Sequence, residues 1–142
     1  MPFPYSRSSN SESETSVIAK EFAAHLENGM IICLNGELGA GKTFFVKQVL
    51  LHFNFENVNS PTFAIVNEYV NSKKFYHFDF YRINKQSELI EIGIEDYFGD
   101  NDSISFIEWA NMFPDILPKK RIEINISFTD DNTREFNFIK YE

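Results

Sequence analysis

The sequence predicts an α/β domain with a mainly parallel central sheet and added antiparallel hairpins. The first observation is a continuous apolar run, Met30 to Asn35, typical of a strand buried on both faces of a parallel sheet. The second is a glycine-rich loop directly after this run, and the third is an apolar helix that follows over about Lys42–His52. A strand, a glycine-rich loop and a helix in this order begin a parallel βα unit, which sets the fold class.

The chain ahead of this strand should contain a flexible tail and one helix. Residues 1–10 are polar and rich in Pro and Ser, so we expect a flexible N-terminal tail, followed by a single domain over residues 11–142. Ser11 and Glu14 have the spacing of a capping box, which predicts that the helix starts there. Gly29 is expected to stop it.

The chain after the helix expected over about Lys42–His52 alternates between β-rich runs and connectors. Residues 54–62 are polar and contain a proline, which predicts a loop. The runs 63–70 and 75–83 flank the turn segment NSKK and predict an antiparallel hairpin. The remaining elements should be short helices over 86–98, a buried strand over 103–109, a connector over 111–120 and a hairpin over 121–141.

Composition and charge exclude several classes of protein. The 142 residues carry a net charge of −8 at pH 7 and only four arginines, which argues against a protein that grips nucleic acid by itself. The single cysteine, Cys33, cannot form an internal disulfide. No signal peptide or membrane-spanning run is evident, so we expect a cytoplasmic protein without a membrane partner.

The segment GELGAGKT is a phosphate-binding loop by its residue types and spacing. Gly36, Gly41, Lys42 and Thr43 fit the pattern G-x-x-x-x-G-K-[ST]. The glycines allow backbone N–H groups to face anionic oxygens, Lys42 should reach the phosphates, and the Thr43 hydroxyl should bind Mg²⁺. The fold should therefore be a three-layer domain of the P-loop NTPase type. The candidate nucleotide-binding residues of the loop are Glu37, Leu38, Gly39, Ala40, Gly41, Lys42, Thr43 and Phe44.

The rest of the chain bears on the kind of phosphate chemistry. A small-molecule kinase usually carries a lid with arginines, and the four arginines here are scattered. The segment NKQS at 84–87 imitates a guanine-reading motif but has Ser87 in place of its aspartate, so we interpret it as an ordinary turn. These observations weaken kinase and GTPase functions and leave ATPase chemistry favoured.

Two acidic residues, Asp79 and Glu108, end apolar strands. A carboxylate at such a position can hold Mg²⁺ or orient the attacking water, and a solvated strand end is about equally common. His77 is two residues before Asp79 on the same face, and we interpret it as a packed sheet residue outside the site. Thr62 could sense the γ-phosphate or could be a plain loop threonine, and Trp109 could pack in the core or form a wall of the site.

The segments GELGAGKT, SPTF, YHFDFYR, SELIEIGIEDYF and FIEW occur in the order seen in the TsaE (YjeE) family, which the chain resembles from about residue 12 to the C-terminal hairpin. The resemblance implies a cytosolic ATPase that uses ATP and Mg²⁺. It would act as an accessory protein of a TsaB–TsaD complex, which modifies a tRNA adenosine beside the anticodon, and would meet tRNA only indirectly. Two alternatives are a nucleotide-gated interaction module in which hydrolysis is incidental and, less favoured, a small-molecule kinase.

The resemblance also implies roles for six residues. Lys42 and Thr43 would bind phosphate and Mg²⁺, Thr62 would belong to a first switch loop, Asp79 would act in hydrolysis or metal organisation, Glu108 would bind Mg²⁺, and Trp109 would be an active-site aromatic. The candidate catalytic residues are thus Asp79, Glu108 and Thr62, and the candidate metal ligands are Thr43, Glu108 and Asp79.

Overall fold

The computed structural model of the protein describes residues 3–61, 64–129 and 132–142. The strands are β1 (Tyr5–Ser9), β2 (Ile31–Asn35), β3 (Val66–Val70), β4 (Lys74–Asp79), β5 (Ile104–Glu108), β6 (Arg121–Phe128) and β7 (Arg134–Tyr141). The helices are α1 (Glu12–Ala23), α2 (Lys42–His52), α3 (Gln86–Glu91) and α4 (Ile94–Phe98), with short 3₁₀ turns at Ala110–Met112 and Pro114–Ile116. No described helix is long and apolar enough to cross a bilayer.

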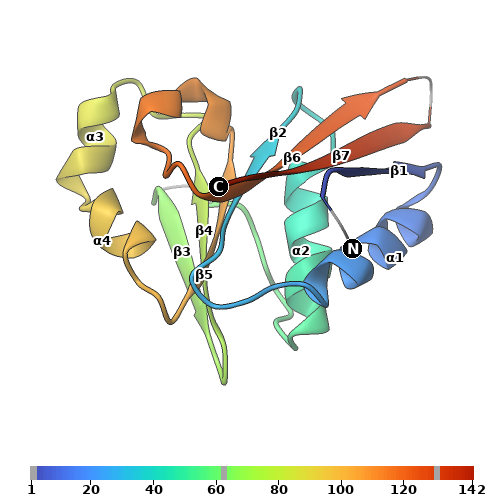
Figure 1. Ribbon diagram of the computed structural model, residues 1–142, viewed down its shortest axis with the longest axis horizontal. Helices are drawn as coiled ribbons and strands as arrows, with labels where there is room; N and C mark the ends of the chain where they lie inside the picture. Colours follow the sequence, from blue (N-terminus) through green and yellow to red (C-terminus); the bar gives the residue numbers. More distant parts are fainter. Residues whose placement is uncertain (1–2, 62–63, 130–131) are drawn as a thin grey trace.

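The strands form one twisted sheet in the order β1-β7-β6-β2-β5-β4-β3 (Figure 1). The pairs β2–β5, β2–β6 and β4–β5 are parallel, whereas β1–β7, β6–β7 and β3–β4 are antiparallel. The prediction of a parallel sheet with antiparallel hairpins is therefore confirmed for the centre of the sheet. Only half of the pairings are parallel, because the hairpins β3–β4 and β6–β7 flank the parallel strands and β1 pairs antiparallel with β7 at the edge.

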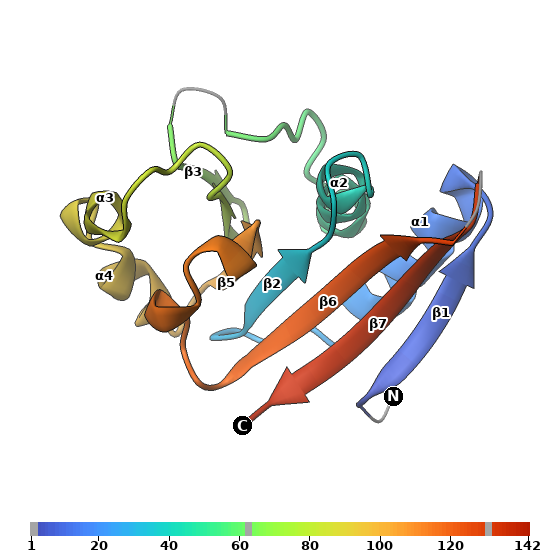
Figure 2. The same cartoon turned by 90° about the horizontal axis from the view of Figure 1, so that it is seen from above.

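Helices cover both faces of the sheet, but unequally. The helices α1 and α2 pack on one face, and α3 and α4 lie on the other, near β4 and β5 (Figures 1 and 2). Two hydrophobic clusters result, one on each face, and alternate residues of β2 belong to different clusters, as the continuous apolar run requires. Over β6, β7 and β1 the second face carries no helix among the described residues (Figure 2), so the three-layer arrangement is complete only over the parallel strands.

The prediction of a flexible tail over residues 1–10 is wrong for Tyr5–Ser9, which form the edge strand β1 antiparallel to β7. The Tyr5 ring stacks on Phe138 with centroids 4.4 Å apart. The hydroxyls of Ser6 and Ser8 donate to side chains of β7 at 2.6 Å each. The polar segment YSRSS lacks the alternating apolar pattern of a half-buried strand, so only its long-range partner makes it a strand.

The cap predicted for the first helix is confirmed at its N-terminus. The Ser11 hydroxyl accepts a hydrogen bond from the Glu14 backbone N–H at 3.1 Å, and the Glu14 carboxylate accepts from the Asn10 N–H. The helix ends at Ala23, well before Gly29. Gly29 has φ +92° and shapes the turn into β2 instead.

Candidate active site

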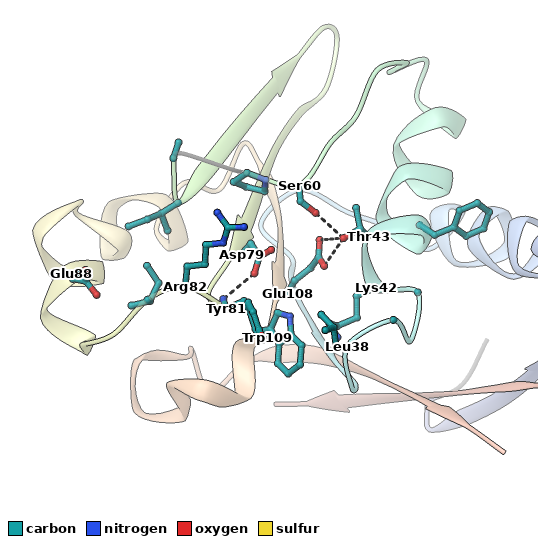
Figure 3. A pocket seen from close by; sticks show the side chains of 17 residues that line it. Leu38, Lys42, Thr43, Ser60, Asp79, Tyr81, Arg82, Glu88, Glu108 and Trp109 are labelled. Carbon is teal, nitrogen blue, oxygen red and sulfur yellow. Dashed lines mark hydrogen bonds between the residues drawn. The ribbon is translucent and has the colours of Figure 1, made fainter. Parts of the chain in front are cut away.

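The candidate site lies where three parallel strands end. The carboxyl ends of β2, β4 and β5 converge on a pocket of about 600 Å³, which opens beside the N-terminus of α2 (Figure 3). Ligands of open α/β sheets bind at this edge. The predicted site residues that line the pocket are Leu38, Gly39, Gly41, Lys42, Thr43, Phe44, Asp79, Glu108 and Trp109.

The phosphate loop, Gly36 to Thr43, has the backbone that its glycines allow. Gly39 and Gly41 have φ values of +82° and +102°, which residues with a side chain rarely adopt. Gly36 is constrained by space instead, because a Cβ there would lie 2.7 Å from the Ile126 carbonyl oxygen of β6. The glycine pattern in the sequence therefore corresponds to two different physical requirements in the loop.

Arg134 supports this loop from β7, 94 residues away in sequence. Its Nε donates to the Ala40 carbonyl at 2.8 Å, and its Nη2 donates to the Gly39 carbonyl at 3.2 Å. Because a trans peptide directs its N–H opposite to its C=O, holding the Ala40 carbonyl aims the Gly41 N–H away from Arg134. The arginine thus orients part of the loop backbone.

Lys42 lies at the start of α2 with its ammonium group inside the loop. Its Nζ donates to the carbonyl oxygens of Gly36 at 2.5 Å and Glu37 at 3.0 Å. It also lies 3.9 Å from the centre of the Trp109 ring, a cation–π contact. Burial lowers the pKa of Lys42, while the nearby carboxylates of Glu108 and Asp79 act in the opposite direction.

Thr43 joins the loop to the acidic end of β5. Its Oγ1 donates to both carboxylate oxygens of Glu108, at 2.7 and 2.9 Å. The Ser60 hydroxyl lies 2.8 Å from Oγ1, and because the Thr43 proton points to the carboxylate, Ser60 is the donor of that contact (Figure 3). Glu108 is only 3 % exposed, so its carboxylate is largely shielded from bulk water, whereas Thr43 and Ser60 are partly exposed and line the pocket.

Asp79 and Glu108 occupy paired positions at the ends of β4 and β5. Asp79 accepts a hydrogen bond from the Tyr81 N–H at 2.9 Å, within its own turn. Burial raises the pKa of Asp79, and the negative charge of Glu108 acts in the same direction. The two carboxylates therefore differ in environment, because Glu108 is bonded to the phosphate-loop threonine and Asp79 faces the open pocket.

Trp109 forms a wall of the pocket. It has φ +59°, an uncommon backbone conformation for a residue with a bulky side chain. Its ring lies 4.9 Å from that of Tyr81, which also lines the pocket. Trp109 lines the pocket and also packs against the hydrophobic cluster on the face covered by α3 and α4, so both alternatives for this residue are met in part.

Some predicted residues lie elsewhere, and some contacts were missed. Thr62 falls outside the described residues. Glu37 and Ala40 belong to the loop but not to the pocket lining. Ser60 and Arg134 were not among the predicted site residues, and His77 was predicted to lie outside the site, whereas its Nε2 lies 2.6 Å from Glu108 Oε2. Two features of the sequence could have indicated these contacts: Ser60 lies two residues before Thr62, and His77 lies on the same strand face as Asp79.

The chain is similar to known proteins over most of its length. The family model for "Threonylcarbamoyl adenosine biosynthesis protein TsaE" matches residues 9–136. A protein of Rickettsia bellii named tRNA threonylcarbamoyladenosine biosynthesis protein TsaE is 40 % identical over 131 residues, which cover 90 % of each chain. The Bacillus subtilis protein of the same name is 39 % identical over 127 residues, covering 88 % of this chain and 78 % of the relative.

A solved structure shares the fold as well. The crystal structure of YdiB from Bacillus subtilis superposes with a TM-score of 0.84 and 30 % sequence identity, covering 100 % of this chain and 88 % of that chain. The family match spans most of the described sheet and every residue of the phosphate loop. The chain therefore belongs to the TsaE family of threonylcarbamoyladenosine biosynthesis proteins.

Proposed function

We propose that this protein binds ATP with Mg²⁺ in the pocket beside the phosphate loop and hydrolyses it. It would do so as an accessory protein of a TsaB–TsaD-type transferase complex that makes threonylcarbamoyladenosine in tRNA. The observation that carries the proposal is the contact of Thr43 with the buried Glu108 carboxylate next to Lys42. A loop lysine, a loop threonine and a carboxylate at the end of a parallel strand form the metal and phosphate site of P-loop NTPases.

The described residues fit a triphosphate and a magnesium ion. Gly39 and Gly41 hold the loop in the backbone conformation of an anion-binding loop, and helix α2 begins directly after it. No group of three or more His, Cys, Asp or Glu side chains among the described residues gathers as a metal cage. This is compatible with Mg²⁺, which is usually held by one or two carboxylates together with substrate phosphates.

Each side chain has a chemical task in this proposal. Lys42 would exchange the carbonyl oxygens of Gly36 and Glu37 for phosphate oxygens. Thr43 would present an Oγ1 lone pair to the metal while its O–H continues to donate a hydrogen bond to Glu108. When bound, Mg²⁺ supplies positive charge that stabilises the charge developing on the transferred phosphoryl group.

Asp79 is the better placed of the two carboxylates to orient water. It does not share the Thr43 contact, and burial raises its pKa, which makes its carboxylate a better proton acceptor. Glu108 is bonded to the threonine and fits the metal side. We therefore assign metal organisation to Glu108 and water positioning to Asp79.

The mouth of the pocket suits a protein partner. Leu38 is 72 % exposed and Tyr81 is 47 % exposed, and both line the pocket. Exposed apolar side chains at the rim of a site are typical of protein interfaces. The net charge of −8 also fits an accessory protein that leaves tRNA binding to its partner.

The same rim favours a second candidate function, in which ATP binding gates assembly with the transferase and hydrolysis is incidental. The two candidates are separated by the Asp79→Ala variant in a multiple-turnover tRNA modification assay. If hydrolysis drives the cycle, modification should stop near one turnover per complex. Continued turnover without hydrolysis would support the gating function.

The ATPase proposal itself is tested by measuring ATP hydrolysis with and without the transferase pair. We expect slow hydrolysis alone and faster hydrolysis with the pair, because small P-loop switches often need a partner to complete the site. In the Thr43→Val variant the Mg²⁺ concentration needed for half-maximal hydrolysis should rise, because a metal ligand is lost. Equal and negligible rates in both conditions would contradict the proposal.

A further inference from the structure

His77 is a fully buried polar residue in an apolar row. It lies on the face of β4 that packs toward α2, next to Phe75 on its own strand face and paired in register with Phe106 of β5. Both phenylalanines belong to the hydrophobic cluster of that face, and His77 is 0 % exposed. Burying an imidazole among apolar side chains is unfavourable unless its polar atoms are hydrogen-bonded.

The hydrogen bonding of this imidazole is directed at Glu108. The His77 Nε2 lies 2.6 Å from Glu108 Oε2, and both side chains are buried. The other ring nitrogen, Nδ1, is buried and has no hydrogen-bond partner among the described residues. A histidine that served only to stabilise the sheet would gain most from pairing both nitrogens, whereas this one pairs one nitrogen with a site carboxylate.

The orientation of the Glu108 carboxylate depends on rotation about its terminal side-chain bond. Rotation of a glutamate carboxylate about its terminal bond is broad, so one hydrogen bond leaves it loosely oriented. Here Thr43 of α2 contacts both oxygens, and His77 contacts Oε2 from the neighbouring strand. Two contacts from different elements fix the plane of the carboxylate.

We propose that His77 is a positioning residue that holds Glu108 oriented for Mg²⁺ through the Nε2–Oε2 hydrogen bond, and thereby sets the affinity of the site for the metal. The inference rests on the proposed function, because it needs Glu108 on the metal side. Hydrogen-bond partners of metal-binding groups commonly change metal affinity or activity by about 10–100-fold when removed.

The test uses Trp109, the only tryptophan of the chain, as a reporter inside the pocket. Its fluorescence is followed while Mg²⁺ is titrated into protein and ATP, and ATP is titrated separately in the presence of EDTA. For His77→Leu we expect the Mg²⁺ midpoint to rise by about 10–100-fold, with unchanged ATP affinity in EDTA. ATP hydrolysis gives a second, independent readout.

Two polar variants separate positioning from packing. The amide nitrogen of Gln can take the place of Nε2, whereas the shorter Asn places its amide nearer to Nδ1. His77→Gln should therefore restore the wild-type Mg²⁺ midpoint, and His77→Asn should resemble His77→Leu. If His77→Leu does not fold, the comparison of Gln with Asn still decides the question.

A matched control lies next to His77 in the same strand. Tyr76 points to the opposite face and donates a hydrogen bond to Asp100 at 3.0 Å. Tyr76→Phe therefore removes one side-chain hydrogen bond of the same strand without affecting the contacts of Glu108. It should leave the Mg²⁺ midpoint unchanged.

The outcomes distinguish this inference from the proposed function. Three results would overturn the role of His77 and leave the proposed function intact. They are a wild-type Mg²⁺ midpoint in His77→Leu, an equal loss of ATP binding with and without Mg²⁺ in that variant, and a His77→Gln variant with the same Mg²⁺ midpoint as His77→Asn. A wild-type protein whose fluorescence and calorimetric titrations show no ATP binding would overturn the proposed function as well.

Discussion

Gly36 and Gly39 belong to one loop but should respond oppositely to the same pair of substitutions. At Gly36 a Cβ would lie 2.7 Å from the Ile126 carbonyl oxygen and 3.1 Å from the Ala40 Cβ. Both neighbours are held in place, one in a sheet strand and the other in the loop. At Gly39 no atom lies within 4 Å of such a Cβ, but φ is +82°. Space limits the first position and backbone conformation limits the second.

The magnitudes can be worked out separately for the two positions. An ordinary contact begins at 3.4 Å and the Cβ would lie at 2.7 Å, so Gly36→Ala requires a displacement of about 0.7 Å between loop and strand. Overpacking of this kind costs about 1–3 kcal/mol, and the smaller entropy of the unfolded alanine chain offsets about 0.4–1 kcal/mol. At Gly39 an alanine in the left-handed region costs about 1–2 kcal/mol, and asparagine tolerates that region better.

The assay is a crossed set of four variants, Ala and Asn at each position, compared by thermal denaturation and by ATP titration of Trp109 fluorescence. Asn should be more damaging than Ala at Gly36, because it is larger. At Gly39 Asn should be less damaging than Ala, because it accepts positive φ. Free energies of unfolding that rank Ala and Asn in the same order at both positions would refute this reasoning.

Three further predictions concern contacts around the loop. Thr43→Val removes a hydrogen bond to the buried Glu108 carboxylate and should lower the free energy of unfolding by roughly 1.5–3 kcal/mol in denaturant titrations, and wild-type stability would contradict it. Burial raises the pKa of Asp79 above its unfolded value, so its contribution to stability is present at low pH and is lost as the pH rises through the folded pKa. Asp79→Asn should therefore raise the melting temperature at neutral pH but not below the unfolded pKa, and a gain independent of pH would speak against burial as the cause. Arg134→Lys loses the two-donor fork that holds two loop carbonyls and should weaken ATP binding by roughly tenfold in the fluorescence titration. Arg121→Lys, in a salt bridge at the far end of β6, is its control, and equal effects in both variants would contradict a role for Arg134 in the loop.

Local sequence patterns were sufficient to predict the centre of the fold. The apolar run of β2, the glycine loop and the helix α2 are consecutive in sequence, so their arrangement follows from neighbouring residues. The strand β1 could not be predicted in this way. Its partner β7 is more than 120 residues away, and its sequence YSRSS has no apolar alternation of its own. Strand formation there depends on tertiary pairing, which overrides local preference.

The same distinction separates the predicted from the missed parts of the site. Asp79 and Glu108 could be predicted to meet, because each ends a strand and the ends of parallel strands share one edge. The contact of His77 with Glu108 depends instead on the register of β4 against β5. A shift of one residue in that register would turn His77 to the opposite face of the sheet.

The contribution of Arg134 depends on long-range topology as well. It reaches the loop only because β7 returns antiparallel to β6, which itself pairs with β2 just before the glycines. The glycine-rich motif alone therefore specifies where phosphate could bind, but not how well the loop is held. The sheet supports the loop through Arg134 of β7, whereas His77 of β4 contacts the Glu108 carboxylate that accepts a hydrogen bond from Thr43.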